Sequence, residues 1–302
     1  MSYDLITILG PTAVGKTKLA ARIAFQLNGE IISADSRQVF KKMDIGTGKD
    51  LSDYLVNNTQ IQYYLIDILN PAEEFNVFQF QKLFYEAFEK INKKGKVPFL
   101  VGGTGLYLNS IISNYQFSEV RFNEERINEL NKLSIESLTS LLKSISKNLH
   151  NTTDLKIKER VIKAIIIAEH KKKSGIPKYP IIKSLNIGIK LDRKKIKQNI
   201  TERLKYRLQN GMIEEVQSLL DDGLSFEKLM FFGLEYKYIG QYLIGEINYN
   251  DMFQKLNSAI HKFAKRQMTW FRKMEREGIK INWINGPDFE AAMKIISEEN
   301  IN

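Results

Sequence analysis

Apolar residues in the first third of the chain follow two alternating patterns. Short uninterrupted runs predict buried strands at 5–9, 31–35, 63–68 and 97–101. After Lys16 and over 75–91, apolar residues instead recur three and four positions apart, as in amphipathic helices. Strands that alternate with helices form parallel sheets with helices on both faces. We therefore expect an α/β fold with a ligand site beyond the carboxyl ends of its strands.

The middle of the chain has a different pattern. Residues 113–185 are polar and helical in period, without a clear strand, and a strand pattern returns at 187–191. Helical patterns then run to about Glu277, and 279–284 predicts a last strand. The simplest arrangement is a discontinuous core, 1–112 and 186–302, that carries 113–185 as a helical insertion.

Composition narrows the class of protein. A hydrophobic fraction of 43% and a charged fraction of 26% are typical of globular proteins. No apolar run approaches the ~20 residues that span a bilayer, and the N-terminus lacks the features of a signal peptide. The absence of cysteine excludes disulfides, thiolate zinc sites and cysteine nucleophiles. We expect a cytoplasmic protein with no membrane partner.

The positive charge is concentrated in the predicted insertion. The chain has a formal net charge of +10, and residues 113–185 hold 14 Lys and Arg against 8 Asp and Glu. Such an excess favours a polyanionic partner, nucleic acid first. A lysine-rich surface that keeps the protein in solution is an equally good interpretation of charge alone.

One motif predicts phosphate binding. Residues 10–17 match G-x-x-x-x-G-K-[ST] between a predicted strand and a predicted helix. In such loops the backbone N–H groups and the helix N-terminus surround phosphate oxygens, Lys16 adds a full charge, and the Thr17 hydroxyl can bind Mg²⁺. We therefore expect a P-loop NTPase-like sheet flanked by helices that binds a diphosphate or triphosphate through Gly10, Pro11, Thr12, Ala13, Val14, Gly15, Lys16 and Thr17.

A nucleotide hydrolase would also need an acid on a later strand to hold magnesium. Asp67 is the nearest candidate, and the residues that follow it, 69–71, do not resemble a water-activating switch. The sequence therefore disfavours hydrolysis as the reaction, although the phosphate loop itself does not say which bond breaks.

Further motifs carry a resemblance to a known family. The phosphate loop is followed by Asp-Ser-Arg-Gln-Val at 35–39, Asp-Ile-Gly-Thr-Gly-Lys at 44–49, Gly-Gly-Thr-Gly at 102–105 and Lys-Arg-Gln-Met-Thr-Trp at 265–270. This series, in this order and over nearly the whole chain, resembles the bacterial tRNA dimethylallyltransferases, also called tRNA isopentenyltransferases. The phosphate loop alone occurs in many families, whereas the other elements together are far more specific.

The resemblance implies a reaction and its residues. Dimethylallyl diphosphate would bind the phosphate loop with Mg²⁺, and its dimethylallyl group would pass to the exocyclic amine of the adenosine 3′ of the anticodon in tRNA, with release of diphosphate. Asp35 matches the general base, Thr104 a residue at the target nucleotide, and Arg203 an arginine that, with Lys16, contacts the diphosphate. From the residues alone, Ser36 and Thr104 could equally be turn or capping residues, and Arg203 could equally be an exposed helical arginine. Asp35 could cap a nearby helix, although its place beside the phosphate loop favours the catalytic role.

The family's tRNA contacts match two groups of residues in this chain. Those of the core are Asp35, Ser36, Arg37, Gln38 and Thr104, and those of the insertion are Arg126, Glu159, Arg160 and Lys163. The partner would be the anticodon stem-loop, bound by a monomer. Two stretches depart from the family pattern: Lys163–Ile166 replaces Arg-Ala-Leu-Glu, and Gly233–Tyr236 replaces Gly-Tyr-Arg-Gln, which puts the choice of tRNA in doubt.

Three alternatives stay open at this point. A free adenine-nucleotide prenyltransferase would share the phosphate loop and Asp35, but it has less need of a basic insertion. A small-molecule kinase would use the same fold for phosphate transfer from ATP. A non-catalytic RNA-binding protein is disfavoured by the intact Lys16, Thr17 and Asp35.

Overall fold

The computed structural model describes residues 3–115, 123–145, 155, 157–173 and 179–299. Its contacts divide the chain into a core unit, Met1–Asn114 with Ile181–Asn302, and an insertion unit, Tyr115–Pro180. The sequence predicts an insertion over 113–185. In the structure the second boundary comes earlier, in front of a strand that begins at Ser184, because that strand pairs with the core sheet.

The core is built on a six-stranded sheet of order β5-β2-β6-β1-β7-β8, in which every pair is parallel. Its strands are β1 (Leu5–Leu9), β2 (Gly29–Ala34), β5 (Tyr63–Tyr64), β6 (Val97–Gly102), β7 (Ser184–Lys190) and β8 (Asn282–Asn285). β1 and β2 are buried along their whole length, which explains their uninterrupted apolar runs. A separate two-stranded ribbon pairs β3 (Leu55–Val56) with β4 (Thr59–Gln60), after the 3₁₀ turn Leu51–Tyr54.

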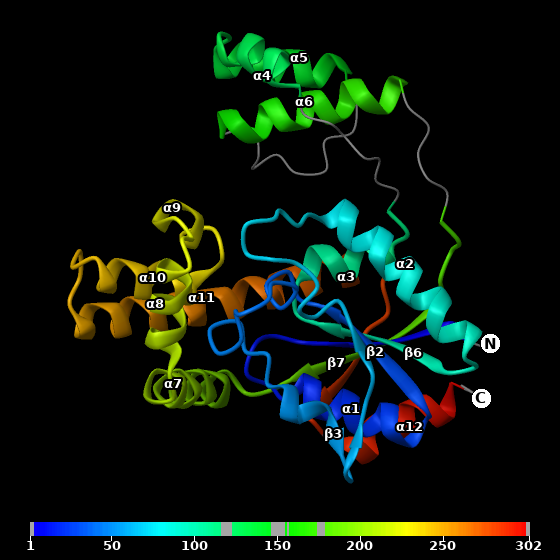
Figure 1. The fold of residues 1–302 in the computed structure, drawn as a ribbon. Coiled ribbons are helices and arrows are strands. Elements are labelled where there is room, and N and C mark those ends of the chain that lie inside the picture. Colours follow the sequence, from blue (N-terminus) through cyan, green and yellow to red (C-terminus); the bar gives the residue numbers. More distant parts are fainter. Residues whose placement is uncertain (1–2, 116–122, 146–154, 156, 174–178, 300–302) are drawn as a thin grey trace. The chain divides into compact units, whose positions relative to one another are not determined.

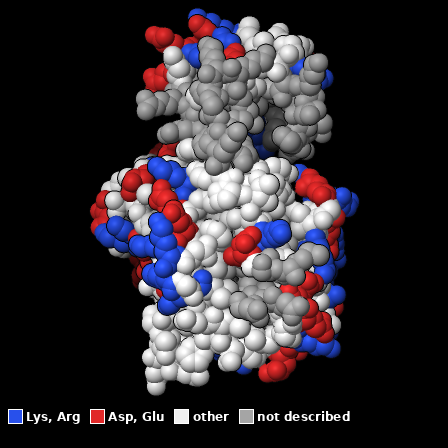
Figure 2. All heavy atoms as spheres, turned by 90° about the vertical axis from the view of Figure 1, so that its right-hand side faces the viewer, with Lys and Arg blue, Asp and Glu red and all other residues white. Residues whose placement is uncertain are grey.

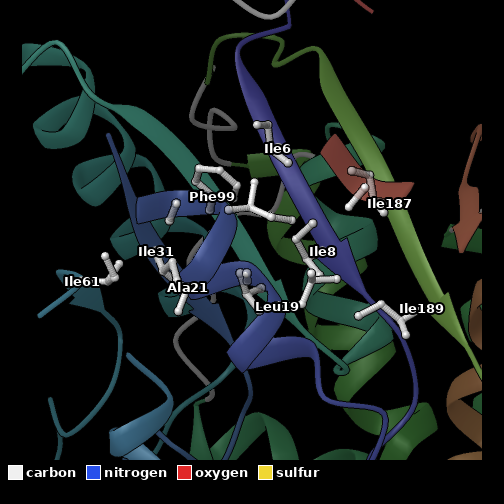
Figure 3. Close-up of a cluster of buried hydrophobic side chains, with 14 of the residues drawn as sticks. Ile6, Ile8, Leu19, Ala21, Ile31, Ile61, Phe99, Ile187 and Ile189 are labelled. Atoms are coloured by element: carbon white, nitrogen blue, oxygen red, sulfur yellow. The ribbon is translucent and has the colours of Figure 1, made fainter. Parts of the chain in front are cut away.

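Helices cover both faces of this sheet (Figure 1). α1 (Lys16–Gln26) and α12 (Phe289–Glu298) lie against one face, and α2 (Val77–Lys93) and α3 (Gly105–Ile112) against the other. Figure 3 shows the core between the sheet and α1, where strand isoleucines pack against small and aliphatic helix residues. The side chains include Ile8, Ile31, Ile187, Leu19 and Ala21. This packing fixes the carboxyl ends of β1, β2 and β6 at one edge of the sheet.

A second group of helices has its own apolar core, centred on residues such as Leu204, Tyr236 and Leu256. It comprises α7 (Arg193–Gln209), α8 (Met212–Asp221), α9 (Phe226–Leu229), α10 (Leu234–Leu243) and α11 (Tyr249–Arg276). Figure 1 shows these helices beside the sheet, with α11 reaching toward α3, and residues of the two helices are in contact. The long helical patterns predicted after residue 191 are thus confirmed.

The insertion unit contains α4 (Glu124–Asn131), α5 (Ile135–Ile145) and α6 (Lys158–Lys173). Leu130, Leu138 and Leu142 pack there against four aliphatic residues of α6, so this unit has its own hydrophobic core. Within the described ranges it holds helices and no strand, as the sequence predicts. Ile165 and Ile166, part of one departure from the family pattern, lie in this core.

Two predicted strands differ from the structure. The strand predicted at 63–68 ends at Tyr64, because Leu65 and Asp67 adopt positive φ angles of 63° and 55° that turn the chain out of the sheet. The last strand is β8, shifted toward the C-terminus from the predicted 279–284.

On the face of the core that Figure 2 shows, Lys and Arg side chains lie among Asp and Glu side chains. No helix within the described ranges is both long enough and apolar enough to cross a bilayer.

Candidate active site

The phosphate-loop motif forms a tight turn between β1 and α1. Gly15 precedes the helix with a φ angle of 80°, a left-handed conformation that favours glycine. At Gly10 a Cβ atom would lie 2.7 Å from the carbonyl oxygen of Ile189 on β7, so the close approach of these strands requires glycine. The loop therefore presents its backbone and the N-terminus of α1 at the carboxyl edge of the sheet, where an anion is favoured.

Two cations meet at this loop. Lys16 Nζ donates a hydrogen bond to the Pro11 carbonyl oxygen over 2.6 Å, and Arg203 Nη2, from α7, donates to Thr12 Oγ1. Burial, and secondly the nearby charge of Arg203, lower the pKa of Lys16 to about 7, against an opposing effect of Asp35. Burial, with the charge of Arg207, also lowers the pKa of Arg203 to about 10. A bound anion would offset this repulsion among cations, so the arrangement favours a bound diphosphate.

The loops after β2 and β6 are joined to each other. Asp35 Oδ1 accepts a hydrogen bond from the Arg37 backbone N–H (2.9 Å), and Thr104 Oγ1 accepts one from the Ser36 backbone N–H (3.3 Å). The backbone N–H of Thr104 donates to the Ala34 carbonyl oxygen (3.3 Å). Asp35 and Thr104 therefore hold turns, and both also line the cavity described below. The turn-capping role and a catalytic role are compatible, since the turn uses one carboxylate oxygen of Asp35.

Gln267 connects the phosphate loop to the loop after β6. From α11, its Oε1 accepts from the Thr12 backbone N–H (2.8 Å) and its Nε2 donates to the Gly103 carbonyl oxygen (2.9 Å). A Cβ atom at Gly103 would lie 2.3 Å from the Gln267 side chain, and one at Gly105 would lie 2.7 Å from Trp270. The Lys-Arg-Gln-Met-Thr-Trp motif thus packs on the Gly-Gly-Thr-Gly motif.

A carboxylate organises the Asp-Ile-Gly-Thr-Gly-Lys motif. Glu215 of α8 accepts hydrogen bonds from the backbone N–H groups of Asp44 (2.8 Å), Ile45 (2.7 Å) and Gly46 (3.0 Å), and from the Tyr236 hydroxyl (2.7 Å). The motif is therefore a loop built around an anion of its own chain. Sequence reasoning gives Glu215 no role, because it lies far from the motif along the chain.

Asp67 is not placed to serve the phosphate loop. It forms an ion pair with the buried Lys49, which also contacts Asp44 (2.8 Å) and the Phe40 carbonyl oxygen (2.5 Å). It does not line the cavity at the phosphate loop. The nearest candidate for a magnesium-binding acid of a nucleotide hydrolase thus has a structural role.

These loops surround a cavity of about 510 Å³ in the core unit. The predicted residues that line it are Thr12, Ala13, Gly15, Lys16, Thr17, Asp35, Ser36, Arg37, Gln38, Thr104 and Arg203. Gly10, Pro11 and Val14 belong to the loop but not to the lining. Arg207, Glu235, Arg266 and the aromatic Phe263 and Trp270 also line it. The Trp270 motif was recognised in the sequence, whereas its position at the cavity follows only from the fold.

Glu235, in the second departure from the family pattern, lies in this cavity. It is half-buried in the first turn of α10, and burial raises the pKa of its carboxyl against the charges of Arg207 and Arg203. Arg37 lies nearby, and burial lowers the pKa of its guanidinium while Asp35 opposes this. A carboxylate among several arginines limits the positive charge on this side of the cavity.

The predicted tRNA contacts of the insertion belong to a separate unit. Arg126 donates to both carboxylate oxygens of Glu169 (3.2 and 2.6 Å) and to Glu129 (2.7 Å), so it joins α4 to α6. Glu159 and Lys163 form an ion pair (3.2 Å) one turn apart on α6, and they are exposed, as is Arg160. The ion pairs explain the spacing of these residues, and their contact with RNA stays a prediction.

Comparison with known proteins agrees with these motifs. The family model described as IPP transferase matches residues 38–274, and the one described as isopentenyl transferase matches residues 3–68. The "tRNA dimethylallyltransferase 2" of Bacteroides fragilis is 51% identical over 94% of the chain and 93% of its own length. The crystal structure of the tRNA isopentenylpyrophosphate transferase from Bacillus halodurans is 32% identical, with a TM-score of 0.67 over 98% of the chain and 94% of its own.

A eukaryotic dimethylallyltransferase crystallised while acting on tRNA has a TM-score of 0.76, over 98% of the chain and 77% of its own. At 21% identity this likeness concerns the fold alone.

Proposed function

Because the chain belongs to the tRNA dimethylallyltransferase family, we propose that it transfers a dimethylallyl group from dimethylallyl diphosphate to the exocyclic amine of the adenosine 3′ of the anticodon in tRNA. The observation that supports this most is the single cavity that joins Lys16 and Arg203 at a phosphate loop with the carboxylate of Asp35. A leaving-group site and a base lie within reach of one bound substrate pair.

The phosphate loop holds the diphosphate of the donor. Lys16, Arg203 and the backbone N–H groups at the start of α1 stabilise negative charge as the allylic C–O bond breaks and its electron pair leaves with diphosphate. The described residues contain no cluster of three acidic or histidine side chains that could hold a metal. The Thr17 hydroxyl therefore fits Mg²⁺ that is bound mainly by diphosphate oxygens. Such an ion would neutralise the leaving group.

Asp35 removes a proton from the acceptor. The exocyclic nitrogen bonds to the allylic carbon as the C–O bond breaks, and it becomes acidic only as this C–N bond forms. A carboxylate is then a sufficient base, and the proton moves to Asp35. Thr104, held against Ser36, lies on the same side of the cavity and orients the nucleotide.

The acceptor base must leave its stack to reach this carboxylate. A cavity of about 510 Å³ with Phe263 and Trp270 in its wall suits an extruded purine beside a five-carbon donor. Ser36, Arg37 and Gln38 also line the cavity, whereas Arg160 and Lys163 of the insertion would contact the rest of the anticodon arm. We propose that the enzyme acts as a monomer in the cytoplasm.

The test is incubation of the full chain with labelled dimethylallyl diphosphate, Mg²⁺ and unmodified tRNA, followed by nucleoside analysis. We expect label on one adenosine next to the anticodon. AMP, ADP and ATP offered as acceptors test the free-nucleotide alternative, and labelled ATP with small acceptors tests the kinase alternative. Label in a free nucleotide, or phosphate transfer in place of prenyl transfer, would overturn the proposal.

A further inference from the structure

A second cavity in the core unit lies between α7 and α11, beyond the carboxyl end of β7. Its volume is about 560 Å³, and its floor is aliphatic. Six cationic side chains line it, and no acidic side chain does: Lys190, Arg193, Lys197, Lys262, Lys265 and Arg272. All six are exposed. We call this cavity the α7–α11 cleft.

No ion pair among the described residues neutralises the charge of the cleft. Among the described residues, none of the six cations forms an ion pair, although other exposed lysines do, such as Lys42 with Asp222 and Lys280 with Glu299. The nearest acid in sequence, Asp192, accepts hydrogen bonds from two backbone N–H groups at the start of α7. Six unpaired cations around one hollow create a positive potential that favours a polyanion.

Shared basic residues connect the cleft to the candidate active site through a third cavity. Lys262 lines both the cleft and a shallower cavity of about 460 Å³, to which Lys255 and Arg266 also contribute. Arg266 in turn lines the cavity at the phosphate loop. Basic side chains therefore follow α11 from the active site into the cleft. From Lys255 to Arg272 the helix rises roughly 25 Å, which is the length of several nucleotides along a strand.

We propose that the α7–α11 cleft binds the phosphate backbone of the tRNA substrate outside the nucleotide that enters the active site. This rests on the proposed function, since it needs RNA to be the substrate. Backbone phosphates fit better than a single small anion, because the six cations surround an open cleft and extend along a helix. The lining also lacks the phosphate-loop motif that a diphosphate would bind at the donor site.

The test compares two double variants of the full chain. Lys197→Ala with Lys262→Ala removes two cations of the cleft, and Lys82→Ala with Lys90→Ala removes two exposed cations of α2 as a matched control. Affinity for full-length tRNA is measured over a salt series by filter binding, and both Michaelis constants are measured in the transfer assay. Thermal unfolding shows that both variants fold.

For the cleft variant we expect tRNA affinity to fall about tenfold or more at low salt, and the slope of log affinity against log salt to flatten by about 1.5, since each lost phosphate contact removes roughly 0.7–0.9. The Michaelis constant for dimethylallyl diphosphate should not change. Equal slopes in the cleft variant and the α2 control would overturn the proposal, as would a raised donor constant with normal tRNA affinity. A wild-type chain that binds tRNA but transfers no prenyl group would contradict the proposed function instead.

Discussion

We predict that the charge of Lys16, which the proposed reaction requires, lowers the stability of the ligand-free protein. Its pKa falls from 10.5 in the unfolded chain to about 7 in the folded one, mainly because the ammonium is buried and secondly because Arg203 is close. The folded state therefore binds fewer protons at Lys16 than the unfolded state between these two values. Stability rises with pH across that window and is lowest at and below pH 7. Lys16→Met, which keeps the length but not the charge, should remove this effect.

The magnitude follows from the two pKa values. At pH 7 the difference corresponds to about 4 kcal/mol of lost stability, from 1.36 kcal/mol per pKa unit. The substitution also removes the hydrogen bond from Lys16 Nζ to the Pro11 carbonyl, which costs about 1 kcal/mol. We expect Lys16→Met to be more stable than the wild type by about 3 kcal/mol at pH 7. Near pH 10.5 it should be equal or slightly less stable.

Urea unfolding followed by tryptophan fluorescence measures this difference, because the chain's two tryptophans, Trp270 and Trp283, both belong to the core unit. Magnesium diphosphate should stabilise the wild type and not the variant, and the variant should transfer no prenyl group. Lys18→Met, at an exposed position of the same helix, is the control and should change stability little. A Lys16→Met protein that is less stable than the wild type at pH 7, or a difference that does not depend on pH, would refute the reasoning.

Three further substitutions test other parts of the site. Asp35→Asn should lower single-turnover prenyl transfer by ~100-fold or more while filter binding of tRNA stays nearly normal, and near-normal turnover would remove Asp35 from the chemistry. Gln267→Leu removes the hydrogen bonds from Gln267 to Thr12 of the phosphate loop and to Gly103. We expect kcat/KM for the donor to fall by about tenfold or more, and urea unfolding to show a loss of about 2 kcal/mol in stability. Unchanged donor kinetics would contradict a role of Gln267 in positioning the phosphate loop. Arg160→Ala with Lys163→Ala should raise KM for tRNA and flatten its salt dependence without affecting donor binding, and a wild-type salt slope would argue against the insertion as an RNA contact.

Local signals determined the parts of the fold that the sequence predicts well. The apolar runs of β1, β2, β6 and β7 are buried on both faces of the sheet, so the composition of each run predicts a strand. Gly10 is required because β7 approaches it closely, and Gly15 because its φ angle is left-handed. Both glycines are part of the phosphate-loop motif, so the sequence predicts them. The third predicted strand, 63–68, is shorter in the structure, because the backbone turns at Leu65 and Asp67 and composition does not show these turns.

The hydrogen bonds that connect distant motifs could not be predicted from the sequence. Gln267 lies in a recognised motif, yet its role depends on partners at Thr12 and Gly103, more than 160 positions away. Glu215 stands in no motif, although it holds the turn at 44–46 by three backbone hydrogen bonds. Both are contacts between secondary-structure elements that meet only in the folded chain. Spacing along the sequence carries no information about them.

The distribution of charge also explains how one cavity can serve two opposite tasks. In the proposed mechanism the phosphate loop holds the leaving anion with Lys16 and Arg203. Burial lowers the pKa of both side chains, with the charge of Arg203 as a second cause at Lys16 and that of Arg207 at Arg203. In the proposed mechanism the base lies close by, and the Asp35 carboxylate is held in place by the hydrogen bond that it accepts from the Arg37 backbone N–H. Glu235 adds a second carboxylate near Arg203 and Arg207, so it offsets part of their positive charge and Asp35 does not have to. On this reasoning the substitution of an acid for the family's arginine need not weaken the chemistry, because it acts on the balance of charge around the diphosphate and leaves the base and the phosphate loop in place.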